Sequence, residues 1–220
     1  SYGTNPCSEI ILRDKQFCNL TEVVIREEDT KETLLEKVRL ATILGTFQST
    51  LDKFQFLSAD WHKNTTEERL LGVSLTGIMD SKMMANPDPV FLEQMRDEAR
   101  KTNEKYAKLL DVPVSAAISC IKPSGTVSQL TNASSGIHSR HSPYYIRTVR
   151  TDKKDSLYEF LKDKGVPVED CLMDKYKQTA VFSFPIKSPK GCITRDDRTA
   201  LQELETWLTY QRYWCEHKPS

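Results

Sequence analysis

Apolar residues recur along the chain with two different spacings, which predict helices and strands respectively. Over 34–54 and 91–110 they recur every three or four residues, as in an amphipathic helix. Short runs rich in β-branched and aromatic residues predict strands at 21–25, 114–121, 144–149 and 179–184. Strands that alternate with helices are typical of an α/β fold with largely parallel pairing.

Three further segments complete the predicted order of elements. An apolar run with two glycines at 72–79 predicts a buried segment, and 156–164 predicts a short helix. A last helix is predicted to be capped by Thr194, with Asp197 three residues on as in a capping box. Its predicted apolar face carries Leu201, Leu204, Leu208 and either Tyr210 or Gln211. No internal repeat or low-complexity linker occurs, so the sequence predicts one domain over 1–220.

Composition excludes several classes of protein. Lys plus Arg and Asp plus Glu both number 31, so a broad basic surface for a nucleic-acid polymer is not indicated. The six cysteines show neither a CxxC pair nor zinc-finger spacing, which is typical of a reducing cytoplasm. No apolar run approaches the roughly 20 residues of a membrane helix, and no leader opens the chain. We expect a cytoplasmic protein without a membrane partner.

The segment Asn5-Pro6-Cys7-Ser8-Glu9 carries candidate chemistry. If it is extended, Asn5, Cys7 and Glu9 point to the same side, so one ligand meets an amide, a sulfur and a carboxylate. Cys18 follows eleven residues after Cys7 and could supply an electron pair. The usual fate of a free cysteine is simple packing, but a glutamate beside a buried cysteine calls for a polar ligand.

A second candidate site lies at 122–130, where an apolar run ends in Lys-Pro-Ser-Gly-Thr. A turn of this kind before a helix presents backbone N–H groups and hydroxyls to an anion, and Gly125 would permit close approach and an unusual φ. It lacks the Gly-Lys-Ser/Thr of a Walker loop, and an ordinary turn capped by Ser124 or Thr126 is the alternative. The candidate phosphate contacts are Pro123, Ser124, Gly125, Thr126 and Val127.

These motifs resemble those of ribonucleotide reductases. Asn-x-Cys-x-Glu with a redox cysteine downstream resembles their active-site finger loop, and 122–130 resembles their substrate-phosphate loop. The stretch 132–147 is similar to the run after that loop in adenosylcobalamin-dependent ribonucleoside-triphosphate reductases. The resemblance covers essentially the whole chain. It implies an α/β fold, as the second half of a ten-stranded α/β barrel with a finger loop through its centre.

The resemblance also implies roles in reducing ribonucleotides to 2′-deoxyribonucleotides. Cys7 would carry a thiyl radical that abstracts the ribose 3′ hydrogen, Glu9 would take the 3′-hydroxyl proton, and Asn5 would hydrogen-bond the substrate. Cys18 would be one of two cysteines that reduce the 2′ position. The implied cofactor is adenosylcobalamin, with no direct metal ligand from the protein, and the reductant is an external dithiol or thioredoxin.

Other interpretations stay open. One is the large subunit of a diiron-dependent ribonucleoside-diphosphate reductase, which relies on a separate radical-generating subunit. Another is a hydrolase that uses Cys7 as nucleophile with His138 or His141. The two histidines lack a third ligand at metal-site spacing, which favours a structural or cofactor-neighbouring role. A third is a non-catalytic half of a split barrel.

The position of Cys7 only seven residues from the start favours an internal fragment or the product of a split gene, because a catalytic loop needs structure on both sides. The expected partners are then the remaining N-terminal and C-terminal parts of the reductase, the ribonucleotide substrate and a thioredoxin-like reductant. The second reducing cysteine would lie in the N-terminal part. We expect no activity from the isolated chain.

Overall fold

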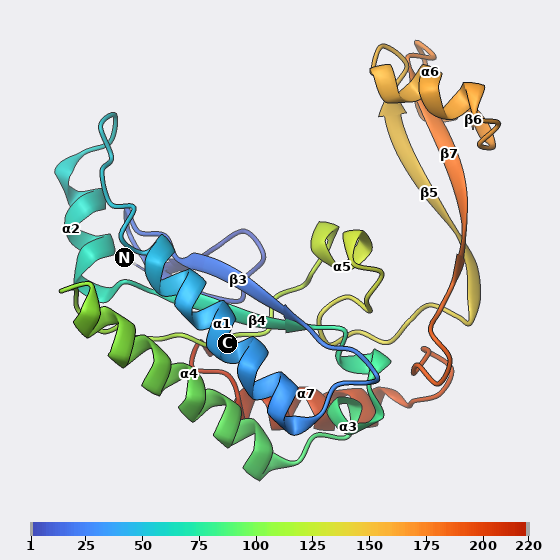
Figure 1. The fold of residues 1–220 in the computed structure, drawn as a ribbon. Coiled ribbons are helices and arrows are strands. Elements are labelled where there is room, and N and C mark those ends of the chain that lie inside the picture. The colour runs from blue at the N-terminus through green and yellow to red at the C-terminus, as the bar shows by residue number, and fades with distance from the viewer. Residues whose placement is uncertain (1, 219–220) are drawn as a thin grey trace. The chain divides into compact units, whose positions relative to one another are not determined.

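The computed structural model describes residues 2–218, which form two compact units (Figure 1). The main unit comprises the described residues up to Arg140 together with those from Gly191 onward, and the second unit is His141–Lys190. Neither boundary has the composition of a linker, so the sequence predicts none there. The mixed α/β class is confirmed, whereas the half-barrel and its central finger loop stay predictions.

A pair of parallel strands forms the centre of the main unit. Strand β3 (Asn19–Val24) pairs in register with β4 (Leu71–Thr76), and every residue of β4 is buried. A strand buried on both faces has a continuous rather than alternating apolar pattern, which is the pattern of this segment. Gly72 is required here, since a Cβ atom would lie 2.5 Å from a methyl group of Leu20.

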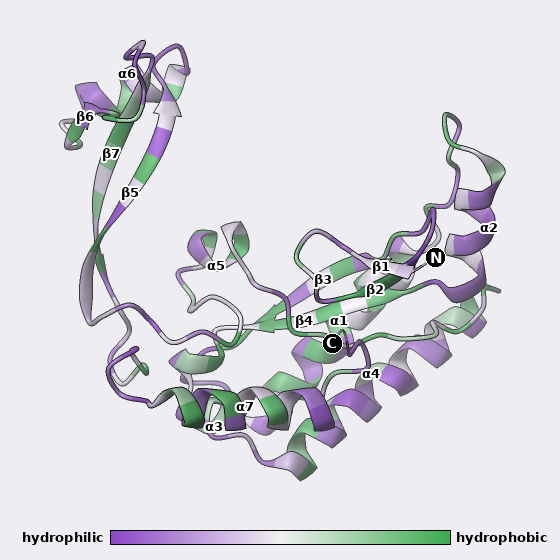
Figure 2. Cartoon of the chain, turned by 180° about the vertical axis from the view of Figure 1, so that it is seen from behind, coloured by the Kyte–Doolittle hydropathy of each residue, from purple (hydrophilic) through white to green (hydrophobic). Residues whose placement is uncertain are grey.

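Helices α1 (Lys31–Gln48), α2 (Ala59–Glu68) and α4 (Pro89–Leu109) occur in the same unit, and α1 lies alongside α4 in both ribbon views (Figures 1 and 2). Figure 2 also shows hydrophobic residues along β3 and β4. The sequence predicts that the first helix continues to residue 54, which is wrong. The hydroxyls of Ser49 and Thr50 bond back to the carbonyls of Thr46 and Phe47, which closes the last turn.

The segment 114–121 is not a regular strand, contrary to prediction. It follows the edge of β4 through hydrogen bonds such as Val73 N to Ile118 O (2.8 Å) and a single parallel bridge between Val73 and Ser119. On its other side, the end of the chain donates to it from Glu216 N to Ser119 O at 3.0 Å. The backbone groups are thus satisfied by two different neighbours rather than by one ladder.

The N-cap of helix α7 (Ala200–Tyr213) lies five residues later than predicted, at Thr199 instead of Thr194. Thr199 and Gln202 form its capping box, while Thr194 and Asp197 bond to each other in a separate turn. The three leucines of the predicted face are exposed, whereas Tyr210, one of the two alternatives for its last position, is buried together with Thr206. The Tyr210 hydroxyl donates to the carbonyl of Met84, so this face was selected by tertiary packing and a hydrogen bond.

Short elements complete the main unit: the hairpin β1 (Tyr2–Thr4) and β2 (Ile11–Arg13), η1 (Ile78–Asp80), α3 (Lys82–Ala85) and α5 (Thr126–Leu130).

In the second unit, β5 (Tyr144–Asp152), β7 (Thr179–Lys187) and β6 (Val168–Asp170) form an antiparallel sheet in that order, accompanied by α6 (Ser156–Asp163). Parallel pairing of named strands is therefore restricted to β3 and β4 in the described chain. None of the helices within 2–218 has the length and apolar character needed to cross a membrane.

Candidate active site

The loop that carries Cys7 is a tight turn at the tip of the β1–β2 hairpin. Ser8 N donates to Asn5 O at 2.9 Å, and Ser8 adopts a φ of 61°. Pro6 fixes the φ that the second position of a turn requires. The prediction of an extended segment from Asn5 to Glu9 with side chains on one side is therefore wrong.

Asn5 closes this turn. Its backbone N donates to Ile10 O, and its side-chain Oδ1 accepts from Ile10 N, both at 3.1 Å. The amide oxygen is thereby committed to the loop, while the amide NH2 group is left to donate to a ligand. Asn5 therefore stabilises the turn that carries Cys7, whether or not it also contacts the substrate.

Cys7 and Glu9 nevertheless meet at one small cavity of about 170 Å³. Cys7 is the exposed member of the six cysteines, whereas Glu9 is 5% exposed. One Glu9 oxygen, Oε2, has no hydrogen-bond partner among the described residues. A buried carboxylate oxygen without a partner is costly, which indicates that a ligand satisfies it. The cavity is lined by Cys7, Ser8, Glu9, Ile121, Pro123, Trp207, Gln211 and His217.

Lys122 joins the two reactive groups. Its Nζ lies 3.2 Å from Cys7 Sγ and 3.3 Å from Glu9 Oε1. Partial burial alone would lower the pKa of Lys122, but the hydrogen bonds to Cys7 and Glu9 outweigh it, and the pKa is raised. Lys122 is therefore a cation in this site at neutral pH.

Cys18 lies directly before β3 and is half-buried as a free thiol. Burial raises its pKa to about 11, with a further contribution from the charge of Glu9, while Lys122 lowers it. Cys18 packs against the cluster that contains Ile10, the residue directly after Glu9. At neutral pH Cys18 is a thiol rather than a nucleophilic thiolate.

The candidate phosphate loop has a different geometry from the one predicted. Gly125 has a φ of −77°, so no unusual backbone conformation is needed. Ser124 is buried and turned inward, where its hydroxyl donates to Glu22 Oε2 at 2.8 Å and accepts from Ser128 N. The N-cap position of α5 is Gly125, and the Ser124 hydroxyl satisfies the N–H of Ser128 in the first turn of the helix. Pro123, Gly125, Thr126 and Val127 are exposed and open to a ligand.

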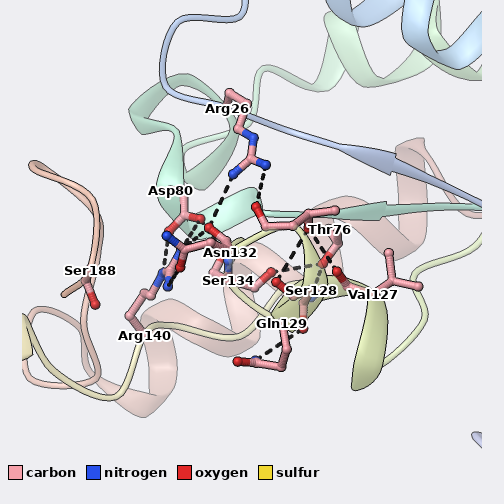
Figure 3. Close-up of polar contacts among 12 residues, drawn as sticks. Arg26, Thr76, Asp80, Val127, Ser128, Gln129, Asn132, Ser134, Arg140 and Ser188 are labelled. Atoms are coloured by element: carbon pink, nitrogen blue, oxygen red, sulfur yellow. Dashed lines mark hydrogen bonds and ion pairs between the residues drawn. The ribbon is translucent and has the colours of Figure 1, made fainter. Parts of the chain in front are cut away.

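A buried ion pair supports the segment behind this loop (Figure 3). Asp80 and Arg140 contact each other through two hydrogen bonds of 2.8 Å, and their side chains are 3% and 4% exposed. Asp80 also accepts from Ser134 N, and Thr76 Oγ1 accepts from Gly136 N, each at 2.8 Å. The turn at 134–136 is thereby fixed to the end of β4 and to η1.

Two arginines hold the end of α5 in place (Figure 3). Arg26 donates to the carbonyls of Thr131 and Asn132, and Arg140 donates to the carbonyl of Asn132 at 2.9 Å. Carbonyls at a helix end have no partner within the helix, so these guanidinium groups satisfy them.

Sequence reasoning missed several of these residues. Lys122 was included only as the first residue of the loop motif, and Glu22, Asp80 and His217 carried no motif. Burial raises the pKa of Glu22, which the hydrogen bond from Ser124 opposes. Burial lowers the pKa of His217, whose Nε2 lies 2.6 Å from the Leu71 carbonyl. A charged residue inside an apolar run, as Glu22 is within β3, is the signal that could have found it.

His138, one of the two histidines suggested as partners of Cys7, does not line the cavity that contains Cys7. His138 N donates to Ser135 O in a loop turn, and the imidazole that lines the cavity is that of His217. Within 2–218, no group of three or more His, Cys, Asp or Glu side chains is arranged to hold a metal ion.

Comparisons with known proteins agree on one group of enzymes. No model of a protein family matches the chain. Over 99% of its length it is 30% identical to a protein of Dictyostelium discoideum described as a probable adenosylcobalamin-dependent ribonucleoside-triphosphate reductase. It is 27% and 26% identical to the enzymes of that name from Euglena gracilis and Levilactobacillus brevis, again over 99% of the chain. The chain spans 28%, 30% and 33% of these three relatives.

The fold is also similar to a solved structure. A B-12 dependent (class II) ribonucleotide reductase matches 98% of this chain with a TM-score of 0.79 and 23% identity, over 34% of its own length. Over essentially its whole length, the chain is thus homologous to one segment of the adenosylcobalamin-dependent ribonucleoside-triphosphate reductases.

Proposed function

We propose that this chain is the catalytic segment of a reductase that converts ribonucleoside triphosphates to 2′-deoxyribonucleotides by thiyl-radical chemistry. The observation that carries the proposal is that Cys7 and Glu9 line one cavity and share contacts with Lys122, while Cys18 packs against the cluster that follows Glu9. The similarity to triphosphate reductases over 99% of the chain supports the reaction and the substrate class.

The roles of Cys7 and Glu9 follow from their surroundings. Cys7 is exposed at the tip of a hairpin, where its thiol can lose a hydrogen atom and take one from the ribose 3′ carbon. Glu9 presents Oε2 without a partner, so this oxygen accepts the proton of the 3′ hydroxyl. Asn5 donates its amide NH2 to the substrate, and its Oδ1 keeps the loop in shape.

Cys18 belongs to the reducing step. The 2′ hydroxyl leaves as water, two thiols are oxidised to a disulfide, and the sugar gains the two electrons. Because Cys18 is a thiol at neutral pH, it and a second thiol can together supply the two electrons and two protons that the reduction consumes. That second thiol and the external dithiol or thioredoxin-like reductant lie outside this chain in the proposal.

The substrate phosphates are proposed to lie against the exposed part of the 123–127 loop. Gly125 has open space around its Cα, so a phosphate oxygen can approach the backbone closely. Thr126 adds an exposed hydroxyl at the start of α5, while the buried Ser124 shapes the loop from within.

Adenosylcobalamin is the proposed cofactor, and the site fits a group that acts on Cys7 from outside the hairpin. The exposed Cys7 is accessible, and the relatives are named as adenosylcobalamin-dependent. When bound, the cofactor supplies the one-electron chemistry that removes a hydrogen atom from a thiol. The chain's own residues hold the thiol at the tip of the hairpin and pair its neighbour Glu9 with Lys122.

The remaining parts of the reductase are proposed to cover apolar surface left open here. One face of α1 carries exposed apolar side chains at regular helical spacing, and α7 carries a second set. Exposed apolar stripes of this size indicate contact with another segment or chain. They are Leu40, Leu44 and Phe47 on α1, and Leu201, Leu204, Trp207 and Leu208 on α7.

Replacing Cys18 by serine in the complete reductase tests the reducing step. The radical still forms and the 3′ hydrogen still leaves, but the pair of thiols is broken. We expect release of free base and decomposition of substrate in place of deoxynucleotide, measured by chromatography of the products. Normal deoxynucleotide yield from this variant with a dithiol would show that Cys18 has only a structural role.

The isolated chain of residues 1–220 is expected to show no reductase activity with adenosylcobalamin and a dithiol. It holds Cys7 and Cys18, but the proposal places the second reducing thiol and the rest of the barrel elsewhere. Activity should return when the missing N-terminal and C-terminal parts are supplied. Multiple turnovers by the purified chain alone would contradict the proposal that it is one part of a longer enzyme.

A further inference from the structure

Lys122 contacts both reactive groups of the candidate active site but takes no part in the steps of the proposed reaction. It lies immediately before the 123–127 loop, and its Nζ contacts Cys7 Sγ and Glu9 Oε1 at 3.2 and 3.3 Å. Its side chain is 27% exposed, against 2% for that of Glu9. A lysine that uses two of its three donors on the two reactive groups connects them directly.

The backbone of Lys122 is held firmly on both sides. Its N–H donates to the hydroxyl of the buried Ser74 at 2.8 Å. Its carbonyl oxygen packs so closely against Gly136 that a Cβ there would lie 2.6 Å away, and Gly136 has a φ of +55°. A pinned backbone restricts where the ammonium group can lie, which is the condition for precise positioning of a site.

The contacts of Glu9 indicate what the ammonium group does. Glu9 is almost fully buried, and an unpaired buried carboxylate is strongly disfavoured. Lys122 occupies Oε1, so the carboxylate has one fixed orientation and Oε2 is left as its free acceptor. The sulfur of Cys7 accepts from the same ammonium, so the thiol hydrogen must point away from Nζ.

We propose that Lys122 is a positioning residue that compensates the buried charge of Glu9, directs Glu9 Oε2 toward the substrate hydroxyl and sets the direction of the Cys7 thiol. The inference rests on the proposed function, since it assigns Glu9 as base and Cys7 as hydrogen-atom carrier. The competing role is direct contact with a substrate phosphate, because lysine beside a phosphate loop commonly acts as a point charge for phosphate.

Steady-state kinetics of Lys122→Met in the complete reductase separate these roles. Positioning predicts that kcat falls about 10²-fold, the lower end of what a general base contributes, with KM for the ribonucleotide nearly unchanged. A phosphate contact predicts the reverse, a raised KM at unchanged kcat, and would overturn the inference. Lys31→Met is the matched control, because it breaks an exposed lysine–carboxylate pair of the same 3.3 Å length and should leave both constants unchanged.

A double-mutant cycle tests whether Lys122 acts through Glu9. If it does, Lys122→Met combined with Glu9→Gln should be about as slow as Glu9→Gln alone. The double variant also removes the unpaired buried charge, so it keeps the test valid where Lys122→Met alone fails to fold. Losses in kcat that multiply independently would overturn the inference.

Chemical rescue gives a readout that a purely structural role would not move. Lys122→Ala should regain part of its kcat when ethylammonium is added, whereas the same concentration of tetramethylammonium, which has no N–H donor, should not restore it. Absence of rescue together with unchanged kcat in Lys122→Met would overturn the inference and leave the proposed function standing. A wild-type enzyme that forms no deoxynucleotide would overturn both.

Discussion

Cys7→Ser in the complete reductase is expected to abolish deoxynucleotide formation while nucleotide binding survives. Serine has nearly the same shape, and its hydroxyl can still accept from Lys122. The O–H bond, however, is too strong to give up and regain a hydrogen atom reversibly at the ribose 3′ position. The measurement is deoxynucleotide yield by chromatography, alongside the dissociation constant of the ribonucleotide.

The matched control for this variant is Cys192→Ser. Cys192 is also a partly exposed cysteine, but it does not line the cavity that contains Cys7. Its replacement should leave turnover near that of the wild type. Deoxynucleotide formation by Cys7→Ser above a few per cent of the wild-type rate would remove Cys7 from the proposed mechanism.

Asp80→Ala is expected to be among the most destabilising single substitutions in the main unit. It leaves Arg140 charged and buried without its bidentate partner, and it removes the acceptor of Ser134 N. Breaking one partner of a buried pair costs about 3–5 kcal/mol. Hydrogen exchange of the Gly136 and Arg140 amides in the complete reductase reports the free energy of local opening around this pair.

Asp60→Ala provides the comparison, because Asp60 forms an exposed pair with Lys15 at 2.6 Å. Solvent screens such pairs, so exchange of amides around them should change little. Equal changes in the two variants would show that the Asp80–Arg140 pair does not hold the 132–140 segment in place.

The sequence predicts the two central segments of the main unit better than the ends of its helices. The β-branched run at 21–25 predicts a strand and the apolar run at 72–79 predicts a buried segment, and the structure contains them as the paired strands β3 and β4, with η1 after β4. The periodic pattern of α1 continues through Leu51, although the helix ends at Gln48. Periodicity records which positions are apolar, whereas the end of a helix depends on local hydrogen bonds such as those of Ser49 and Thr50.

The residues of α7 do not by themselves predict which face of the helix is buried. Leucines at 201, 204 and 208 are the more hydrophobic set, yet Thr206 and Tyr210 are buried. The structure buries Tyr210 because its hydroxyl reaches the carbonyl of Met84. The exposed leucines of α7 are typical of a helix that contacts another part of a protein. Such a contact cannot be predicted from the sequence of one segment alone.

Some residues of the candidate site can be predicted from the sequence, whereas others are recognised only in the folded structure. Cys7, Glu9 and Cys18 are close in sequence, and their motif is sufficient to single them out. Lys122 is separated from Cys7 by 115 positions, so its contact depends on how the 114–121 segment follows β4. The turn at Asn5–Ser8 had a sequence signal in Pro6, which outweighs the alternation assumed for an extended strand.

The most direct test of the proposed function is the reaction of the complete polypeptide with a ribonucleoside triphosphate, adenosylcobalamin and a dithiol. We predict one 2′-deoxynucleotide for each dithiol oxidised, no product when adenosylcobalamin is omitted, and slower turnover of substrate that carries deuterium at the 3′ carbon. Failure to form deoxynucleotide with all components present, or formation at the same rate without adenosylcobalamin, would contradict the proposed function.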